Sequence, residues 1–274
     1  MNGSTALRRK ILCGDALQVL WTLPRDSARL VVADPPYGKV LCGEAWDNQW
    51  ADTEAYLAWS ARWMVGALQV LCPGGLLYCF GQVGKREHVW LHLLSQAARG
   101  WTFHDLIIWD RCVGYNERRD SFTPAYEMIL VLRKDGAPPF FNKDAVREPY
   151  DAATAARYAR DRRYKNAAAR WTHLCRGKYA TNLWRIPSLK GQSKERVGHP
   201  SQKPLALIER IVLSSSAPGD LVLDPFLGSG TTAVACEKYG RNWLGIEASP
   251  EYCLLAQARI EAARKGVCWA GEAA

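Results

Sequence analysis

The sequence predicts an α/β fold with a doubly wound, parallel sheet. Short apolar runs alternate along the chain with segments of helical periodicity, which is the pattern of βαβ units. Two of these runs, Leu30–Ala33 and Leu221–Leu223, each lead into an acidic residue and a turn. Ligands bind at such strand ends in open α/β sheets. A length of 274 residues allows one large domain, or one domain with an insert.

Each expected element rests on a local signal. Asp52 or Thr53 can cap a helix in which Tyr56, Trp63 and Ala67 recur at helical spacing. Cys72-Pro73-Gly74-Gly75 should end that helix, and Gly38–Trp50 has no period, which indicates a loop. The expected strands are Arg9–Asp15, Leu30–Ala33, Leu76–Phe80, Leu106–Trp109, Glu127–Leu132, Leu221–Leu223 and Trp243–Ile246. The expected helices are Ala16–Leu23, Thr53–Leu71, Lys203–Ser216, Thr231–Tyr239 and Pro250–Arg264.

Composition indicates an intracellular enzyme. The nine cysteines are an odd number and form no CxxC pair, which favours reduced thiols over a disulfide framework, a zinc finger or an iron–sulfur site. No apolar run approaches the roughly 20 residues of a membrane span. The first ten residues are basic but lead into no apolar segment, so we expect no signal peptide.

The positive charge is concentrated in one segment, Phe141–Arg196. It holds 14 Lys and Arg against 5 Asp and Glu, an excess of +9 that equals the net charge of the whole chain. Aromatic side chains interleave with the basic ones, at Tyr150, Tyr158, Tyr164, Trp171, Tyr179 and Trp184. Basic groups bind phosphates and planar rings stack on bases, so the segment favours nucleic-acid binding. The alternative is a solvated helical surface whose tyrosines form a small core of their own.

The Gly-rich turn Gly228-Ser229-Gly230-Thr231-Thr232-Ala233 follows an apolar run and precedes a helix. It fits G-x-G-x-x-G/A, and the acidic Glu247 comes 17 residues after Gly230, where it can hold ribose hydroxyls. A dinucleotide-dependent oxidoreductase is the competing interpretation. Only 44 residues follow Gly230, so earlier elements must complete the sheet, unlike a fold that opens with this unit. The acidic and aromatic lead-in Asp224-Pro225-Phe226 also suits a cationic sulfonium better than a pyrophosphate.

Three motifs together resemble a known family. Asp34-Pro35-Pro36-Tyr37 comes first, His199-Pro200-Ser201-Gln202-Lys203-Pro204 follows far downstream, and the turn from Asp224 to Thr231 comes last. This order resembles the β-group of S-adenosylmethionine-dependent DNA amino-methyltransferases, from Leu12 to about Ile260. The resemblance implies a Rossmann-like methyltransferase sheet with an inserted target-recognition region. It divides the chain into a catalytic-motif part (8–140), the basic recognition region (141–196) and a cofactor-binding part (197–265) of the same domain.

The resemblance also implies site residues. The cofactor S-adenosyl-L-methionine would be bound by Asp15, Ala16, Ser201, Lys203, Asp224, Phe226, Gly228, Gly230, Thr231 and Glu247. Within this set, Asp15 would meet the adenine edge, and Lys203 would lie near the methionine carboxylate. Asp15 could instead be a helix cap, and Lys203 a surface residue at a helix start. The DNA-binding candidates in the basic segment are Arg160, Arg162, Arg163, Lys165 and Arg170.

The catalytic candidates are Asp34, Pro35, Pro36 and Tyr37. An exocyclic amine is a poor nucleophile because its lone pair is delocalised into the ring. The Asp34 carboxylate and the Pro35 carbonyl can accept hydrogen bonds from its two N–H groups and so localise the lone pair. The prolines stiffen the turn that holds these acceptors. Tyr37 can stack on a base that has left the duplex. Methyl transfer would then be a direct displacement that needs no metal and no covalent enzyme intermediate.

The sequence leaves several functions open. The lead is an adenine-N6 DNA methyltransferase that acts on double-stranded DNA in the cytoplasm and is encoded by a prokaryote or a phage. Cytosine-N4 methylation uses the same geometry, although that branch more often has serine where this chain has Asp34. A non-catalytic DNA-recognition protein, or an RNA or protein amide methylase, is a further alternative. A homodimer and a separate restriction endonuclease are also open. His88 and His92 are expected on a helix face and not as metal ligands, and Trp46 and Trp50 could close over a base or pack their loop down.

Overall fold

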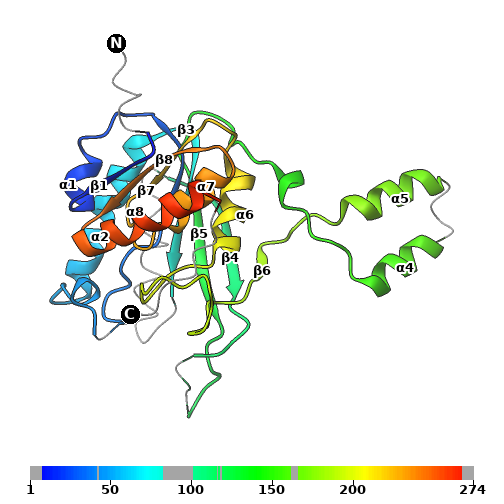
Figure 1. The fold of residues 1–274 in the computed structure, drawn as a ribbon, viewed down its shortest axis with the longest axis horizontal. Helices are drawn as coiled ribbons and strands as arrows, with labels where there is room; N and C mark the ends of the chain where they lie inside the picture. The colour runs from blue at the N-terminus through cyan, green and yellow to red at the C-terminus, as the bar shows by residue number, and fades with distance from the viewer. Residues whose placement is uncertain are drawn as a thin grey trace.

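The fold is a single eight-stranded sheet covered by helices on both faces, with an arm that projects from one side (Figure 1). The computed structural model of the chain describes residues 8–41, 43–82, 101–115, 117, 119–161 and 166–266. The strand order is β1-β8-β7-β2-β3-β5-β4-β6. The strands are β1 (Lys10–Cys13), β2 (Ala28–Ala33), β3 (Leu71–Gly81), β4 (Thr102–Asp110), β5 (Tyr126–Arg133), β6 (Leu183–Arg185), β7 (Leu221–Asp224) and β8 (Asn242–Glu247).

Apart from α4 (Ala152–Arg160) and α5 (Ala167–Arg176), the described helices form two layers, each over its own apolar core. The helices of these layers are α1 (Ala16–Leu20), α2 (Thr53–Val70), α6 (Leu205–Ser215), α7 (Thr231–Lys238) and α8 (Pro250–Arg264). Two 3-10 turns are η1 (Ala45–Asp47) and η2 (Lys143–Val146). One core joins the sheet to α1 and α2 through Leu20 and Trp63, and the other joins it to α6, α7 and α8 through Ile211, Ala235 and Ile260. The expected doubly wound α/β arrangement is therefore confirmed.

The expectation of a parallel sheet needs one correction. β5 runs antiparallel to both of its neighbours, β3 and β4, while the other pairings are parallel. β5 is the next described element after β4, and neighbouring strands that are joined directly form an antiparallel pair. The short edge strand β6 was not expected from the sequence, because only Trp184 of its three residues is buried.

The first turn after α2 also differs from the expectation. Cys72-Pro73-Gly74-Gly75 was expected to separate helix from strand, but β3 begins at Leu71, directly after the helix. The register against β2 shifts between the Ala28–Leu71 pair and the Leu30–Leu76 pair, so these four residues form a bulge. Gly74 has φ of +74° there, and a Cβ would meet the Pro138 carbonyl oxygen, so the bulge requires glycine.

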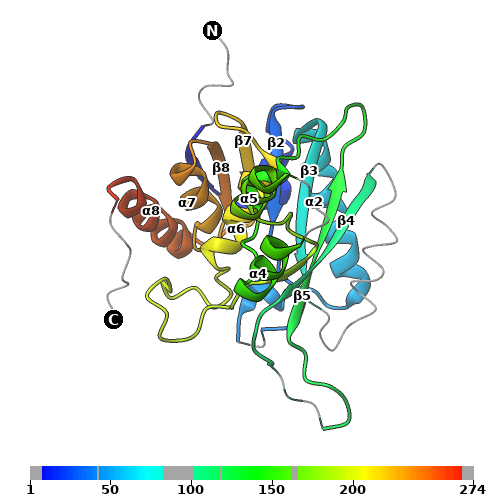
Figure 2. The same ribbon diagram turned by 90° about the vertical axis from the view of Figure 1, so that its right-hand side faces the viewer.

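The middle of the basic segment, from Glu148 to Lys178, forms an arm that projects from the body (Figures 1 and 2). Trp184, from the same basic segment, lies instead in the main core. Helices α4 and α5 pack on each other, and none of the side chains described in either helix is buried. Glu148 and Lys178 pair as an antiparallel bridge at the base of the arm. Arg210 of α6 reaches Glu148 at 2.9 Å and ties this base to the body. None of the helices in the described ranges is long and apolar enough to span a membrane.

Candidate functional site

The structure brings the two acidic turns together. β2 and β7 are neighbouring parallel strands, and Val31 pairs with Leu223. Both strands end at the carboxyl edge of the sheet, so the turn that starts at Asp34 lies beside the turn that starts at Asp224. Chain connections diverge at this position, β2 continuing through α2 to β3 on one side while β7 continues through α7 to β8 on the other. It is a topological switch point, where open α/β sheets bind ligands.

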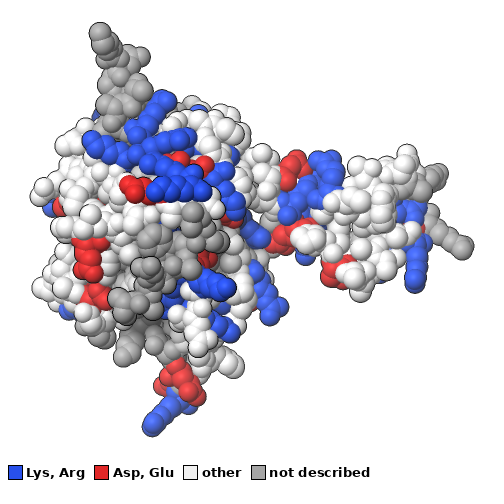
Figure 3. All heavy atoms as spheres, viewed as in Figure 1, with Lys and Arg blue, Asp and Glu red and all other residues white. Residues whose placement is uncertain are grey.

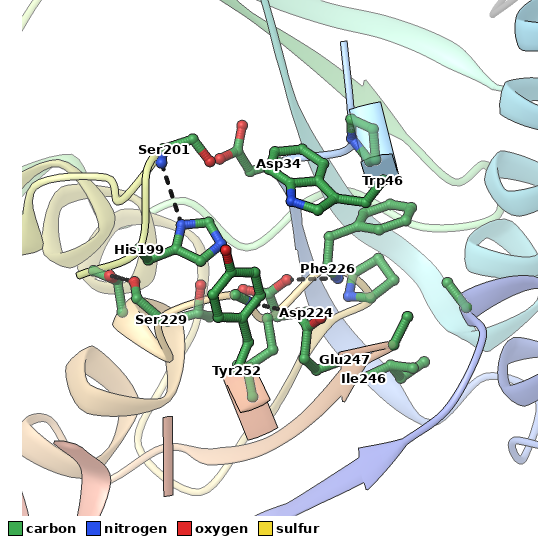
Figure 4. A pocket seen from close by; sticks show the side chains of 18 of the residues that line it. Asp34, Trp46, His199, Ser201, Asp224, Phe226, Ser229, Ile246, Glu247 and Tyr252 are labelled. Atoms are coloured by element: carbon green, nitrogen blue, oxygen red, sulfur yellow. Dashed lines mark hydrogen bonds between the residues drawn. The ribbon is translucent and has the colours of Figure 1, made fainter. Parts of the chain in front are cut away.

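Two pockets adjoin at this edge. Pocket A, of about 960 Å³ including the space open to solvent, lies over the ends of β1, β7 and β8 (Figure 4). Pocket B, of about 1070 Å³ on the same basis, extends toward β4 and β5. Asp34, Trp46, Ser201, Gln202 and Lys203 line both pockets. A molecule in either pocket can therefore reach Asp34.

Carboxylates held by backbone N–H groups define pocket A. Glu247, at the end of β8, accepts hydrogen bonds from Gly228 N and Ser249 N, each at 2.8 Å. Asp224 accepts one from Phe226 N at 3.0 Å. Burial raises the pKa of Glu247 above its ordinary value, and burial raises that of Asp224 to about 7. These carboxylates stand ready to bind hydroxyl or cationic groups of a ligand.

The lining of pocket A fits the expected cofactor. Its acidic residues are Asp15, Asp34, Asp224 and Glu247, while Lys203 is the one Lys or Arg among the lining residues that the structure describes. A negative lining of this kind suits a sulfonium and an α-amino group and disfavours a pyrophosphate. Gly228 has φ of +50°, and a Cβ there would lie 3.1 Å from His199 Nε2. The glycine therefore keeps this wall of the pocket open.

The structure places nine of the ten cofactor candidates in the wall of pocket A: Asp15, Ala16, Ser201, Lys203, Asp224, Phe226, Gly228, Thr231 and Glu247. Gly230 is the exception. It caps α7 with φ of +77°, and a Cβ there would meet Ala256 of α8 at 3.1 Å. Gly230 thus serves the packing of α7 on α8. Asp15 combines both roles considered for it, because it also accepts a hydrogen bond from Gln18 N as the cap of α1.

Aromatic side chains surround the mouth of pocket A (Figure 4). Trp46 stacks on His199, with ring centroids 6.2 Å apart, and His199 meets Tyr252 edge to face at 4.4 Å. Burial lowers the pKa of His199 to about 4, so the ring is neutral near pH 7. Trp50 instead packs into the core against Tyr56 and Trp59. Of the two loop tryptophans, Trp46 faces the site and Trp50 holds the loop down.

The loop after Tyr37 is held by a residue that the sequence did not single out. Asp47 is 1% exposed and accepts hydrogen bonds from Gly38 N at 2.9 Å and from Val40 N and Leu41 N, each at 2.7 Å. Tyr56 donates to the Pro36 carbonyl at 2.8 Å and fixes the turn itself. The Asp34–Tyr37 turn is therefore rigidly positioned between the pockets.

Asp34 belongs to a buried polar cluster at the boundary of the pockets. Its Oδ1 accepts from the Tyr37 hydroxyl at 2.8 Å, and its Oδ2 accepts from Lys203 Nζ at 2.7 Å. The same Tyr37 hydroxyl lies 3.1 Å from Glu127 Oε2, and Arg111 lies 3.0 Å from Glu127 Oε1. The structure thus places Lys203 on Asp34 itself, whereas the resemblance located it near the methionine carboxylate.

Glu127 and Arg111 lie in this cluster, although sequence reasoning did not select either. Glu127 was counted only as the start of the strand now seen as β5, and Arg111 stands beyond the end of β4. A carboxylate that opens a strand of buried apolar residues was the available signal, because such a position is costly without a partner. Among the described residues, no group of three or more His, Cys, Asp or Glu side chains could hold a metal ion. His88 and His92 lie outside the described residues.

Two of the five DNA-binding candidates, Arg160 and Arg170, lie on the described part of the arm. Arg160 ends α4, and Arg170 in α5 donates to the Ala159 carbonyl at 2.6 Å. Arg162, Arg163 and Lys165 lie outside the described residues. Tyr150 packs edge to face on Tyr158 and bonds to His173, which is the small aromatic core considered as an alternative, while Trp171 is 65% exposed. Figure 3 shows Lys and Arg side chains at the base of the arm and toward its far end, with acidic side chains also at the base.

Comparison with known proteins agrees with this geometry. Residues 28–258 match a family model described as DNA methylase. The chain belongs to the DNA methylase family. It is 31% identical over 260 residues to the type II methyltransferase M.HpaI of Haemophilus parainfluenzae, covering 94% of this chain and 76% of that protein. It is 32% identical over 259 residues to the DNA adenine methyltransferase YhdJ of Escherichia coli, covering 93% and 83%.

The structural comparison supports the same family. A DNA modification methylase of Thermus thermophilus, TTHA0409, solved in complex with S-adenosyl-L-methionine, superposes with a TM-score of 0.63 at 28% identity, covering 94% of this chain and 95% of that one. The family is S-adenosylmethionine-dependent, so the expected family, fold and cofactor are confirmed. The chain is a DNA amino-methyltransferase of the N6/N4 family, and its target base is the next question.

Proposed function

We propose that this DNA methylase transfers a methyl group to the N6 amine of adenine in double-stranded DNA. The observation that carries the proposal is the position of Asp34 in the wall shared by pockets A and B. The cofactor would occupy pocket A and the base pocket B, so that the amine and the methyl group meet beside Asp34. The aspartate at this position and the likeness to an adenine methyltransferase both favour adenine over cytosine.

S-adenosylmethionine supplies a methyl carbon made electrophilic by its sulfonium. In pocket A, Glu247 would bind the ribose hydroxyls and Asp15 the adenine edge, while Asp224 would face the cationic part of the ligand. The Asp34 carboxylate and the Pro35 carbonyl accept hydrogen bonds from the two N–H groups of the target amine and so localise its lone pair. As the new N–C bond forms, the C–S bond breaks with its electrons on sulfur. The amine then loses one proton, which Asp34 is placed to accept.

The target base must leave the duplex before this reaction. Asp34 is only partly exposed and lies at the boundary of two pockets, where an amine inside the base stack cannot reach it. The ring of Tyr37 lines pocket B and can stack on the extruded base. The basic segment 141–196, with its arm, would hold the surrounding duplex, with Arg160, Arg162, Arg163, Lys165 and Arg170 on phosphates or base edges.

Nucleoside analysis tests the proposed target. Purified protein is incubated with labelled S-adenosylmethionine and genomic DNA that lacks methylated bases, and the digested nucleosides are separated. The proposal predicts label in N6-methyladenine. Label in N4-methylcytosine would assign the alternative base. DNA that is bound without any methylation would indicate a non-catalytic recognition protein.

A further inference from the structure

The buried cluster around Asp34 contains charged side chains that have no role yet in the proposed reaction. Glu127 is 5% exposed and Lys203 is 8% exposed, and their side chains approach to 3.6 Å. Arg111 completes the set, with two anionic and two cationic side chains within one connected network. Burying ions is costly, so each of them needs its partners for the folded state to be stable.

Lys203 poses a difficulty for the chemistry of Asp34. The Lys203 ammonium, 2.7 Å from Oδ2, withdraws electron density from the carboxylate that must accept a hydrogen bond from the target amine. Burial acts to lower the pKa of Lys203, but the charges of Asp34 and Glu127 outweigh it and raise that pKa, so the side chain stays protonated. With Asp34 as its only anionic partner, Lys203 would largely cancel the charge of the acceptor.

Glu127 provides the second anionic partner. It approaches Lys203 with the same oxygen, Oε2, that lies 3.1 Å from the Tyr37 hydroxyl. Its other oxygen, Oε1, is fixed by Arg111 at 3.0 Å. The two carboxylates therefore balance the two cations, whereas the network without the charge of Glu127 would carry a net positive charge beside the position of the amine. Tyr37 links the two carboxylates.

We propose that Glu127 is a positioning residue for methyl transfer, which shares the charge of Lys203 and so leaves Asp34 anionic toward the target amine. Glu127 acts through Lys203 and Tyr37 and need not touch the base. The proposal rests on the proposed function, in which the Asp34 carboxylate accepts a hydrogen bond from the target amine. It predicts that the charge of residue 127 matters more than its shape.

Two substitutions separate charge from shape. Glu127→Gln keeps the size and the hydrogen-bonding oxygen but removes the charge, and the single-turnover rate at saturating DNA and cofactor should fall about 10- to 100-fold. Glu127→Asp keeps the charge on a shorter side chain and should retain a higher rate than Glu127→Gln. The dissociation constants for cofactor and DNA should change less than about threefold in either variant, because the network acts on the chemical step.

Glu237→Gln is the matched control. The Glu237 side chain is 7% exposed, against 6% for Glu127. Like Glu127, which faces Arg111 and Lys203, it is paired with two cations, Arg9 and Arg264, and with one neutral donor, Trp243 Nε1. It lies on α7, outside both pockets. Thermal unfolding of all variants is measured beside the rates. Glu237→Gln should lose a similar amount of stability while keeping the wild-type rate.

The outcomes are distinct. A wild-type rate in Glu127→Gln overturns the proposal, as does a Glu127→Asp variant that is folded and no faster than Glu127→Gln. If Glu127→Gln does not fold, Glu127→Asp decides, and a loss as large as that of Asp34→Ala overturns the proposal. Wild-type protein assayed in parallel shows whether methyl transfer to adenine occurs at all, so failure of the proposed function is recognised separately.

Discussion

Alanine at Gly230 should destabilise the fold while sparing the cofactor site. Gly230 has φ of +77°, and a left-handed residue other than glycine costs about 1–2 kcal/mol. The new Cβ would lie 3.1 Å from the Cβ of Ala256, which is fully buried on α8, and overpacking of this kind costs about 1–3 kcal/mol. The expected loss of unfolding free energy is therefore about 2–5 kcal/mol, which at about 2 °C per kcal/mol for a domain of this size is roughly 4–10 °C in Tm.

Gly240→Ala isolates the packing contribution. Gly240 has nearly the same φ, +71°, but no atom lies within 4 Å of a Cβ built there, so only the backbone cost of about 1–2 kcal/mol applies. Gly228→Ala isolates the ligand contribution, because its Cβ would press on His199 in the wall of pocket A. Thermal unfolding and calorimetry with S-adenosylmethionine are measured on all three. The reasoning would be refuted if Gly230→Ala were no less stable than Gly240→Ala, or if Gly230→Ala alone lost affinity for the cofactor.

The remaining predictions concern the arm and Asp224. Neutralising Arg160, Arg162, Arg163 and Lys165 should weaken DNA binding and flatten its dependence on salt while sparing cofactor affinity, because each neutralised phosphate releases counterions. Filter binding over a salt series tests this, and unchanged slope and affinity would place the DNA surface elsewhere. Burial raises the pKa of Asp224 to about 7, against about 3.9 in an unfolded chain, so the folded protein retains a proton that the unfolded chain has released between these values. The stability contribution of Asp224 should therefore fall as pH rises from about 4 to about 7 and then level off. In Asp224→Asn this part of the slope should vanish from the profile of Tm against pH. Identical profiles for the variant and the wild type would contradict this expectation.

Local sequence patterns predicted most of the fold. Strands such as β7 and helices such as α2 were identified because apolar periodicity and capping residues act within a few residues of each other. The antiparallel direction of β5 and the edge strand β6 depend on which strand is a neighbour, and no local pattern encodes that. The bulge at Cys72–Gly75 likewise depends on the register against β2.

The site divides in the same way. Asp34, Asp224 and Glu247 were found because each ends a strand and forms part of a motif. Glu127 lies on β5 and Arg111 directly follows β4, and only the folded sheet brings these two side chains into the cluster around Asp34. Gly230 and Lys203 were selected as residues of the motifs, but the contacts that the structure gives them, with Ala256 and with Asp34, come from elements distant in sequence.

Asp34→Ala gives the most direct test of a site in which the methyl donor and the target amine meet at one carboxylate. Calorimetry measures S-adenosylmethionine binding, and a single-turnover assay measures methyl transfer to DNA by the same preparation. Cofactor affinity should stay within about threefold of wild type, because Asp224, Glu247 and Asp15 still line pocket A, while the transfer rate falls at least about 100-fold. A transfer rate near that of wild type would contradict the role of Asp34, and a lost rate that merely follows lost cofactor binding would contradict its position between the two pockets.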